Sequence, residues 1–225
     1  MATFTYTATS TDFKTGYTNN YWAYGNFAYQ GNNATPGEYE YTNHCFGVMV
    51  FQGAGNKLKG RNIDSISFTF KFARAGRYLN GAYKKLKIHE SVYQEIDTSR
   101  SAVLYLDKNK VLGSLDVVGY DTTESFTLDA DNNTALFNNL KNYFSNGNSA
   151  IIIYNDEDTS TDFYSRHFLQ ILEATITVTY DGGESVVYIS NGTTFEAYQV
   201  YIDNGTSWDL YAPYIDNGSG WESYG

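Results

Sequence analysis

The chain has 225 residues, of which 42% are hydrophobic and 17% aromatic, so it can bury a substantial core and is not intrinsically disordered. The formal net charge is −10, and residues 181–225 carry seven acidic side chains without a single Lys or Arg. This charge argues against nucleic acid as a partner, because binding to phosphate backbones depends on clustered basic residues. Since the sequence has neither a run of about 18 apolar residues nor a basic, apolar leader, we expect no membrane span and no secretory signal.

Alternating apolar and polar residues dominate residues 1–180 and predict half-buried β-strands. In chain order the predicted strands are Phe4 to Ala8, Tyr39 to Tyr41, Phe46 to Phe51, Ile66 to Phe72, Leu86 to His89, Val103 to Tyr105, Ser125 to Leu128, Ile151 to Tyr154 and Ala174 to Tyr180. Short strands separated by loops rich in Gly, Asn and Asp indicate two packed antiparallel sheets. The predicted fold is therefore an all-β, jelly-roll-like antiparallel β-sandwich over residues 1–180.

One segment of this region follows a helical period instead. Its apolar residues are Leu136, Phe137, Leu140, Tyr143 and Phe144. Asn133 is the expected N-cap, and Asn146-Gly147 is the expected stop signal. We therefore expect one short helix that closes an end of the sandwich core. The single cysteine, Cys45, is expected to be a buried small hydrophobic residue.

Residues 181–225 contain three copies of Tyr-Ile-x-Asn-Gly-x-x-(Phe/Trp)-x-x-Tyr with a period of 13 residues, beginning at Tyr188, Tyr201 and Tyr214. A fixed short period indicates one small unit repeated along the chain, which builds contact surfaces more often than catalytic clefts. Asn-Gly between strand-like runs predicts a two-residue hairpin turn. That turn would place Tyr188 opposite Phe195, Tyr201 opposite Trp208, and Tyr214 opposite Trp221.

Each such aromatic pair contributes roughly 0.2–1 kcal/mol, too little to stabilise an isolated short hairpin. The repeats should therefore pack on each other, on the sandwich or on other chains. The residues expected to make these packing or oligomer contacts are Tyr188, Phe195, Tyr201, Trp208, Tyr211, Tyr214, Trp221 and Tyr224. The predicted organisation is a sandwich domain, residues 1–180, followed by a tail of three β-hairpin repeats, residues 181–225.

Aromatic residues among Asn, Gly and Thr in residues 17–29 suggest a platform on which sugar rings could stack. The candidate glycan-binding residues are Tyr21, Trp22, Tyr24 and Tyr29. Two other interpretations remain open for the same rings: burial inside strands, and contact with another subunit.

The sequence predicts neither a catalytic residue nor a cofactor. His44 and Cys45 are neighbours on a predicted strand and would point to opposite faces, so they cannot form a thiol–imidazole pair. No metal site is predicted, although the acidic segment from Asp156 to Asp162 could be either a calcium loop or a solvated turn. Asp129 to Asn133 begins like a calcium loop but lacks the Gly and Glu that an EF-hand requires, and capping of the helix explains it better.

Four stretches of the second half of the sandwich, together with the repeats, carry a family resemblance. The stretches are Leu136 to Leu140, Tyr143 to Asn148, Ile152 to Asn155 and Leu169 to Tyr180. They resemble the C-terminal half of sandwich domains in virion proteins of tailed phages that infect Firmicutes. The Tyr-Ile-Asp-Asn-Gly-x-x-Trp repeat, the most specific part, resembles the ends of such proteins. The pattern that closes the last strand also ends many carbohydrate-binding jelly rolls.

The resemblance implies a non-enzymatic, oligomeric protein located in the virion, in the head-fibre, tail-tip or decoration class. Its implied partners are other virion proteins and a host cell-surface glycan, and a homotrimer is favoured by analogy with fibre-like phage proteins. The alternative function is that of a carbohydrate-binding module that recognises cell-wall or plant polysaccharide.

Overall fold

The computed structural model divides the chain into two units, Ala2–Asp181 and Gly182–Gly225, the second of which also takes in Met1. The described residues are 1–17, 22–23, 27–32, 44–73, 85–96, 105–119, 121–155, 167–181, 186–190, 195–199, 201–203, 208–210, 214–216 and 221–223.

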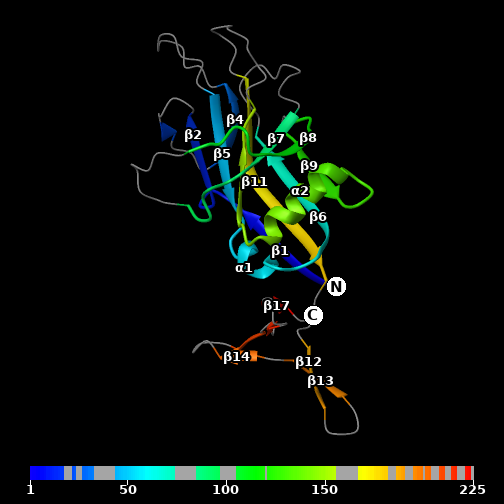
Figure 1. Ribbon diagram of the computed structural model, residues 1–225. Coiled ribbons are helices and arrows are strands. Elements are labelled where there is room, and N and C mark those ends of the chain that lie inside the picture. Colours follow the sequence, from blue (N-terminus) through cyan, green and yellow to red (C-terminus); the bar gives the residue numbers. More distant parts are fainter. Residues whose placement is uncertain are drawn as a thin grey trace. The chain divides into compact units, whose positions relative to one another are not determined.

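The strands of the first unit pair into one antiparallel sheet (Figure 1). Within the described residues its eleven strands are β1 (Ala2–Ala8), β2 (Phe13–Tyr17), β3 (Trp22–Ala23), β4 (Ala28–Asn32), β5 (His44–Val50), β6 (Ile63–Phe72), β7 (Lys85–Glu90), β8 (Val111–Asp116), β9 (Thr123–Leu128), β10 (Ala150–Ile153) and β11 (His167–Tyr180). The order along the sheet is β8-β7-β10-β5-β4-β11-β6-β9, with β1 on β11, β2 on β5 and β3 on β2. The helices are α1 (Ala54–Leu58) and α2 (Thr134–Ser145). The predicted all-β antiparallel fold with a short helix is confirmed.

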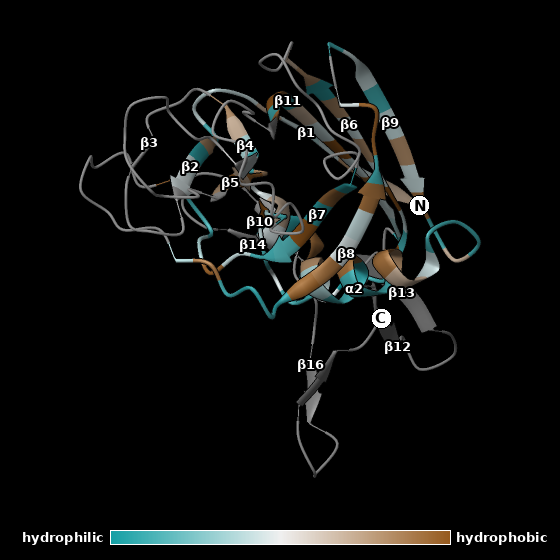
Figure 2. Ribbon diagram, turned by 90° about the horizontal axis from the view of Figure 1, so that it is seen from above, coloured by the Kyte–Doolittle hydropathy of each residue, from teal (hydrophilic) through white to brown (hydrophobic). Residues whose placement is uncertain are grey.

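The sheet curls into a sandwich because β11 belongs to both of its layers. The first part of this 14-residue strand pairs with β4, and the remainder pairs with β6 on one side and β1 on the other. A register shift between Ile171 and Glu173 marks the place where the partner changes, and such bulges bend a strand. The two expected layers are therefore continuous: in Figure 2, β4 and β5 lie on one side, and β1, β6 and β9 on the other.

The core is built from the predicted alternating residues of the two longest strands. The buried positions are Ile66, Phe68, Phe70 and Phe72 of β6 and Ala174, Ile176, Val178 and Tyr180 of β11. The rings of Phe68 and Phe70 stack with their centroids 5.4 Å apart. Each fully buried side chain of this size stabilises the fold by about 1.5–3 kcal/mol. Cys45 is also buried, as predicted.

Helix α2 confirms the predicted helical segment. Its buried residues are Leu136, Phe137, Leu140, Tyr143 and Phe144. The helix ends at Ser145, after which Gly147 adopts a φ of 88° and donates its N–H to the Phe144 carbonyl oxygen at 2.9 Å. The expected start is corrected in one respect: Asn133 stands at the N-cap with a φ of 54°, but its side chain makes no capping hydrogen bond. The helix therefore begins without a side-chain cap at Asn133.

Several elements were not predicted, and each lacks a periodic signal. β2, β4 and β8 contain a Gly that interrupts the alternation of apolar and polar residues. α1 has five residues, fewer than two helical turns. The predicted strand Tyr39 to Tyr41 and residues 103–104 lie outside the described residues, and Tyr105 lies outside any strand.

The strands of the first unit end at two opposite poles. At one end of β11, His167 pairs with Asn32, and Gly31 pairs with Cys45; we call this end the loop pole. At the other end Tyr180 pairs with Ala2 of β1 and Ile63 of β6; we call this end the tail pole. At about 3.3 Å per residue, β11 separates the poles by about 45 Å.

The chain leaves the first unit at the tail pole through a fixed contact. Asp181 donates its backbone N–H to the Asn62 carbonyl oxygen at 2.9 Å, and its carboxylate accepts the Asn62 N–H at 2.9 Å. Lys141 of α2 also donates to the Asn62 side-chain oxygen, at 2.6 Å. Asn62 therefore holds the last residue before the tail through two hydrogen bonds, and Lys141 in turn fixes the Asn62 side chain.

Candidate functional site

The loop pole is the place where most long connections of the first unit begin and end. The strand ends at this pole belong to β2, β4, β5, β6, β7, β10 and β11, as their registers require. The segments that join them are 18–21, 33–43, 74–84 and 156–166. In sequence these segments contain the aromatic residues Tyr21, Tyr39, Tyr41, Tyr78, Tyr83, Phe163 and Tyr164. The topology thus anchors segments from four parts of the chain at one pole, and the sequence of each segment contains at least one aromatic residue.

Of the predicted glycan-binding residues, the structure places Trp22 and Tyr29, both on strands that end at or next to the loop pole. Tyr21 and Tyr24 lie outside the described residues. Trp22 belongs to β3, where its backbone pairs with that of Gly16. Tyr29 belongs to β4 and is half-buried. The centroids of the Tyr29 and Phe27 rings lie 4.6 Å apart in an edge-to-face arrangement. Part of the Tyr29 ring therefore packs within the sandwich, as one of the open interpretations allowed.

A buried amide braces the sandwich near the loop pole. Gln30 of β4 is 0% exposed; its Nε2 donates to the Lys85 carbonyl oxygen and its Oε1 accepts the Lys87 N–H, both at 2.9 Å. Asn155 Nδ2 donates to the same Lys85 oxygen at 3.1 Å. β4 and β7 are not neighbours in the sheet, so the Gln30 side chain crosses the interior and pairs with β7 as a peptide group would. This contact fixes the strand ends from which the connecting segments start.

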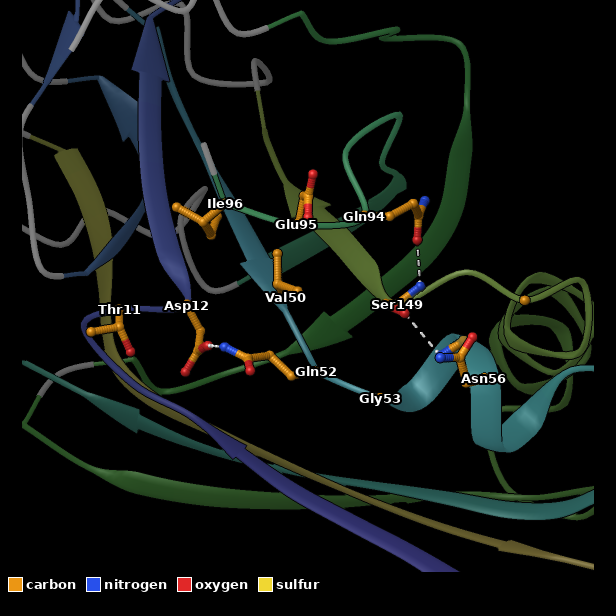
Figure 3. A pocket seen from close by; sticks show the side chains of 12 residues that line it. Thr11, Asp12, Val50, Gln52, Gly53, Asn56, Gln94, Glu95, Ile96 and Ser149 are labelled. Atoms are coloured by element: carbon orange, nitrogen blue, oxygen red, sulfur yellow. Dashed lines mark hydrogen bonds between the residues drawn. The ribbon is translucent and has the colours of Figure 1, made fainter. Parts of the chain in front are cut away.

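A second feature, a cavity of about 600 Å³, lies beside α1 (Figure 3). One wall centres on Asp12, which is 2% exposed in the turn between β1 and β2. Its carboxylate accepts hydrogen bonds from the Tyr6 hydroxyl at 3.0 Å, the Thr9 N–H at 3.0 Å and Gln52 Nε2 at 2.5 Å. The Asp12 carbonyl oxygen accepts the Val50 N–H at 3.0 Å, which ties this turn to the end of β5. Asp12 thereby orients Gln52 at the cavity wall.

The Asp12 carboxylate also changes the chemistry of Tyr6. Burial, followed by the hydrogen bond to Asp12 and the negative charge of that carboxylate, raises the pKa of Tyr6 from 10.0 to about 12. Tyr6 therefore stays a neutral donor throughout the physiological pH range. Because three donors already hold the Asp12 carboxylate, this arrangement is that of a structural acid that positions its neighbours.

The opposite wall of the cavity depends on Ser149. The Ser149 hydroxyl oxygen accepts the Gly55 N–H at 2.8 Å, and the Ser149 N–H donates to Gln94 Oε1 at 2.5 Å. Gln94 Nε2 in turn donates to Asn148 Oδ1 at 3.1 Å. A Cβ atom at Gly55 would lie 2.3 Å from the Gly147 carbonyl oxygen, so only glycine allows α1 to approach this wall so closely. Sequence reasoning missed the cavity, since its residues come from four separate parts of the chain.

The tail unit contains three hairpins whose register differs from the prediction. They are β12 (Val186–Ser190) with β13 (Phe195–Gln199), β14 (Tyr201–Asp203) with β15 (Trp208–Leu210), and β16 (Tyr214–Asp216) with β17 (Trp221–Ser223). Trp208 pairs with Asp203 and Tyr201 with Leu210, so the two aromatic residues are not directly opposite. The same shift of two positions occurs in the other hairpins, where the registers pair Tyr188 with Ala197, Phe195 with Ser190, Tyr214 with Ser223, and Trp221 with Asp216.

The predicted directly opposed aromatic pairs are therefore wrong. The paired strands are separated by four residues in each hairpin, whereas the Asn-Gly signal predicted two. Four-residue connections are also common in hairpins, so the turn residues alone do not choose between the two registers. Tyr211 and Tyr224 lie outside the described residues. The packing and oligomer contacts expected of the repeat aromatics stay predictions.

The remaining polar candidates have structural environments where they are described. His89 is 2% exposed, and its Nε2 donates to the Tyr154 carbonyl oxygen at 3.1 Å. The Asp129 carboxylate, which precedes α2, accepts hydrogen bonds from the Asn132 side chain and from the backbone N–H groups of Asp131 and Asn132. These bonds, that from the Asn132 side chain first, lower the pKa of Asp129. Among the described residues, no group of three His, Cys, Asp or Glu side chains is placed to hold a metal ion. The acidic segment from Asp156 to Asp162 lies outside the described residues.

No protein-family model and no curated protein matches this chain. Within the part of the chain that the structure describes, neither helix is long and apolar enough to span a membrane.

Proposed function

We propose that this protein is a non-enzymatic structural and attachment protein of a phage particle, in the head-fibre, tail-tip or decoration class. The observation that carries the proposal is the polarity of the first unit. Connections from four parts of the chain are anchored at the loop pole, while the tail continues from Asp181 at the opposite pole. A domain built in this way can present one end to a target while its other end is tethered.

The repeats supply the tether in this proposal. Each of the three hairpins pairs within itself among the described residues, so each is too small to be stable by itself and gains from contact with a second surface. The sequence resemblance to phage virion proteins supports the same assignment. We expect the repeats to join copies of the chain, with a homotrimer favoured.

Light scattering on the full chain tests the role of the repeats. The sequence has three Trp residues, of which Trp22 belongs to the sandwich and Trp208 and Trp221 to the tail. A Trp208→Ala/Trp221→Ala variant should lose mass relative to the wild type, and Trp22→Ala, the matched control, should keep the wild-type mass. If the wild type and both variants have the same monomeric mass, the repeats do not join copies of this chain.

The virion assignment is tested on particles. An antibody against the protein should detect it in phage particles purified by density gradient from a lysate that produces it. Its presence in the soluble fraction alone would contradict a virion location, whatever its oligomeric state.

A carbohydrate-binding function is the second candidate, and the aromatic sequence of the segments anchored at the loop pole favours it. In this case Trp22→Ala should abolish binding to host cell-wall polysaccharide and leave the melting temperature nearly unchanged. The Trp208→Ala/Trp221→Ala variant should still bind a polysaccharide column at saturating protein. A large drop in the melting temperature of Trp22→Ala would assign this ring to the core instead.

A further inference from the structure

The cavity beside α1 is a site whose chemistry can be read from its walls (Figure 3). Its volume of about 600 Å³ lies within the range of about 300–1,000 Å³ that is typical of small-molecule sites. The lining residues are Thr11, Asp12, Val50, Gln52, Gly53, Gly55, Asn56, Gln94, Glu95, Ile96, Gly147 and Ser149. All of them belong to the first unit.

The charge of the lining restricts the ligand. The described residues that line the cavity include the carboxylates of Asp12 and Glu95 and no Lys, Arg or His. A phosphate or a carboxylate ligand would therefore meet two like charges without a compensating cation. The cavity is suited to a ligand without negative charge.

The hydrogen-bonding groups restrict the ligand further. The Ser149 hydroxyl accepts the Gly55 N–H and still has its own proton to donate. The Asn56 side chain and the Glu95 carboxylate make no hydrogen bond within the part of the chain that the structure describes. Together these groups of the lining offer both donors and acceptors, which matches hydroxyl groups, since each hydroxyl both donates and accepts. A purely cationic ligand would leave the donors unused.

We propose that this cavity binds a short neutral saccharide. Asn56, Glu95 and Ser149 bind its hydroxyl groups, and the side chains of Val50 and Ile96 contact its C–H groups. Gln52 and Gln94 are held in place by Asp12 and by the Ser149 N–H, so these parts of the walls are formed before the ligand arrives. The site lies beside α1, and none of its lining residues belongs to the segments anchored at the loop pole. It does not depend on the proposed virion role.

Calorimetric titration of the full chain tests the proposal with four trisaccharide probes. The neutral probes are cellotriose, maltotriose and triacetylchitotriose, and the anionic probe is trigalacturonic acid. At least one neutral probe should bind, and the anionic probe should not. Asn56→Ala should weaken binding of that neutral probe about tenfold, as expected for the loss of one or two hydrogen bonds. Binding should be insensitive to salt, because the ligand carries no charge.

Two control variants make the result specific. Asn138→Ala changes an exposed amide on α2, outside the cavity, and should leave binding unchanged. Trp22→Ala changes the loop-pole tryptophan of the second candidate function and separates the two sites, since loss of binding in this variant would assign the saccharide to the loop pole. The proposal is overturned if none of the neutral probes binds, if Asn56→Ala binds as well as Asn138→Ala, or if Trp22→Ala removes the binding. Urea unfolding of Asn56→Ala verifies that the variant is folded.

Discussion

Replacing Gly55 by Ala sets two physical effects against each other. Gly55 lies inside α1, where Ala is favoured over Gly by about 1 kcal/mol of helix propensity. The new Cβ, however, would lie 2.3 Å from the Gly147 carbonyl oxygen and 2.6 Å from the Ser149 hydroxyl oxygen. The first of these atoms is backbone and cannot rotate away, so either α1 or the wall must move.

The steric effect should win. Overpacking typically costs about 1–3 kcal/mol, and displacement of α1 also weakens the hydrogen bond from the Gly55 N–H to Ser149, worth about 1 kcal/mol. After subtraction of the gain in propensity, Gly55→Ala should lower the free energy of unfolding by about 1–3 kcal/mol. Urea denaturation of the full chain, followed by circular dichroism, measures this change.

Asn56→Ala is the matched control for this experiment. It adds an Ala at the next position of the same short helix, where the native side chain is exposed, and should change stability by a few tenths of a kcal/mol at most. If Gly55→Ala proves as stable as the wild type or more stable, then the close approach of α1 to Gly147 and Ser149 is wrong.

Two further predictions concern the core and the Asp12 network. Phe70→Ala should lower the free energy of unfolding in urea by about 3–5 kcal/mol, because the ring is 0% exposed and stacks on Phe68. Phe126→Ala changes a half-buried residue of an edge strand and should lower it clearly less. Equal losses in the two variants would contradict the assigned core. Folding raises the pKa of Tyr6 from 10.0 to about 12, so the folded chain binds a proton that the unfolded chain releases in this interval. The stabilisation from Tyr6 is thus present below pH 10 and is lost as the pH rises toward 12. Tyr6→Phe should remove this part of the alkaline loss of stability, and an unchanged pH profile in urea unfolding would contradict the contact with Asp12.

Strands and helices could be predicted from the sequence where the apolar residues recur with a single period and all lie on the buried face of the element. The alternation from Ile66 to Phe72 and the helical spacing from Leu136 to Phe144 each identify the buried side, because burial of the apolar face decides the structure locally. The same reasoning cannot show that β11 joins both layers. The bulge at Ile171 and the exchange of partners beyond it depend on strands far away in the sequence.

The cavity shows a different limit of prediction from sequence. Asp12 and Gln52 are separated by 40 positions, and Gly55 and Ser149 by 94, so no local pattern joins them. The only local hint is the presence of glycines at positions 53, 55 and 147, where backbones approach closely or adopt positive φ. Such glycines mark a tight place in a fold, but they do not show which side chains meet there.

The charge of the tail makes one more prediction about assembly. Residues 181–225 carry seven acidic side chains and no basic ones, so any contact between tails brings like charges together. Raising the ionic strength from about 0.01 M to about 1 M shortens the Debye length from about 30 Å to about 3 Å and screens this repulsion. If the repeats join copies through each other, light scattering should show a larger share of oligomer at high salt.

The opposite salt dependence would give a different physical account. The first unit contains all the Lys and Arg residues of the chain, and oligomers formed by acidic tails on these basic residues would be weakened by salt. A loss of oligomer at high salt would therefore refute direct contact between tails. The Trp208→Ala/Trp221→Ala variant separates the two cases from a general effect of salt, since tail-mediated oligomers of either kind should be weaker in this variant at every ionic strength.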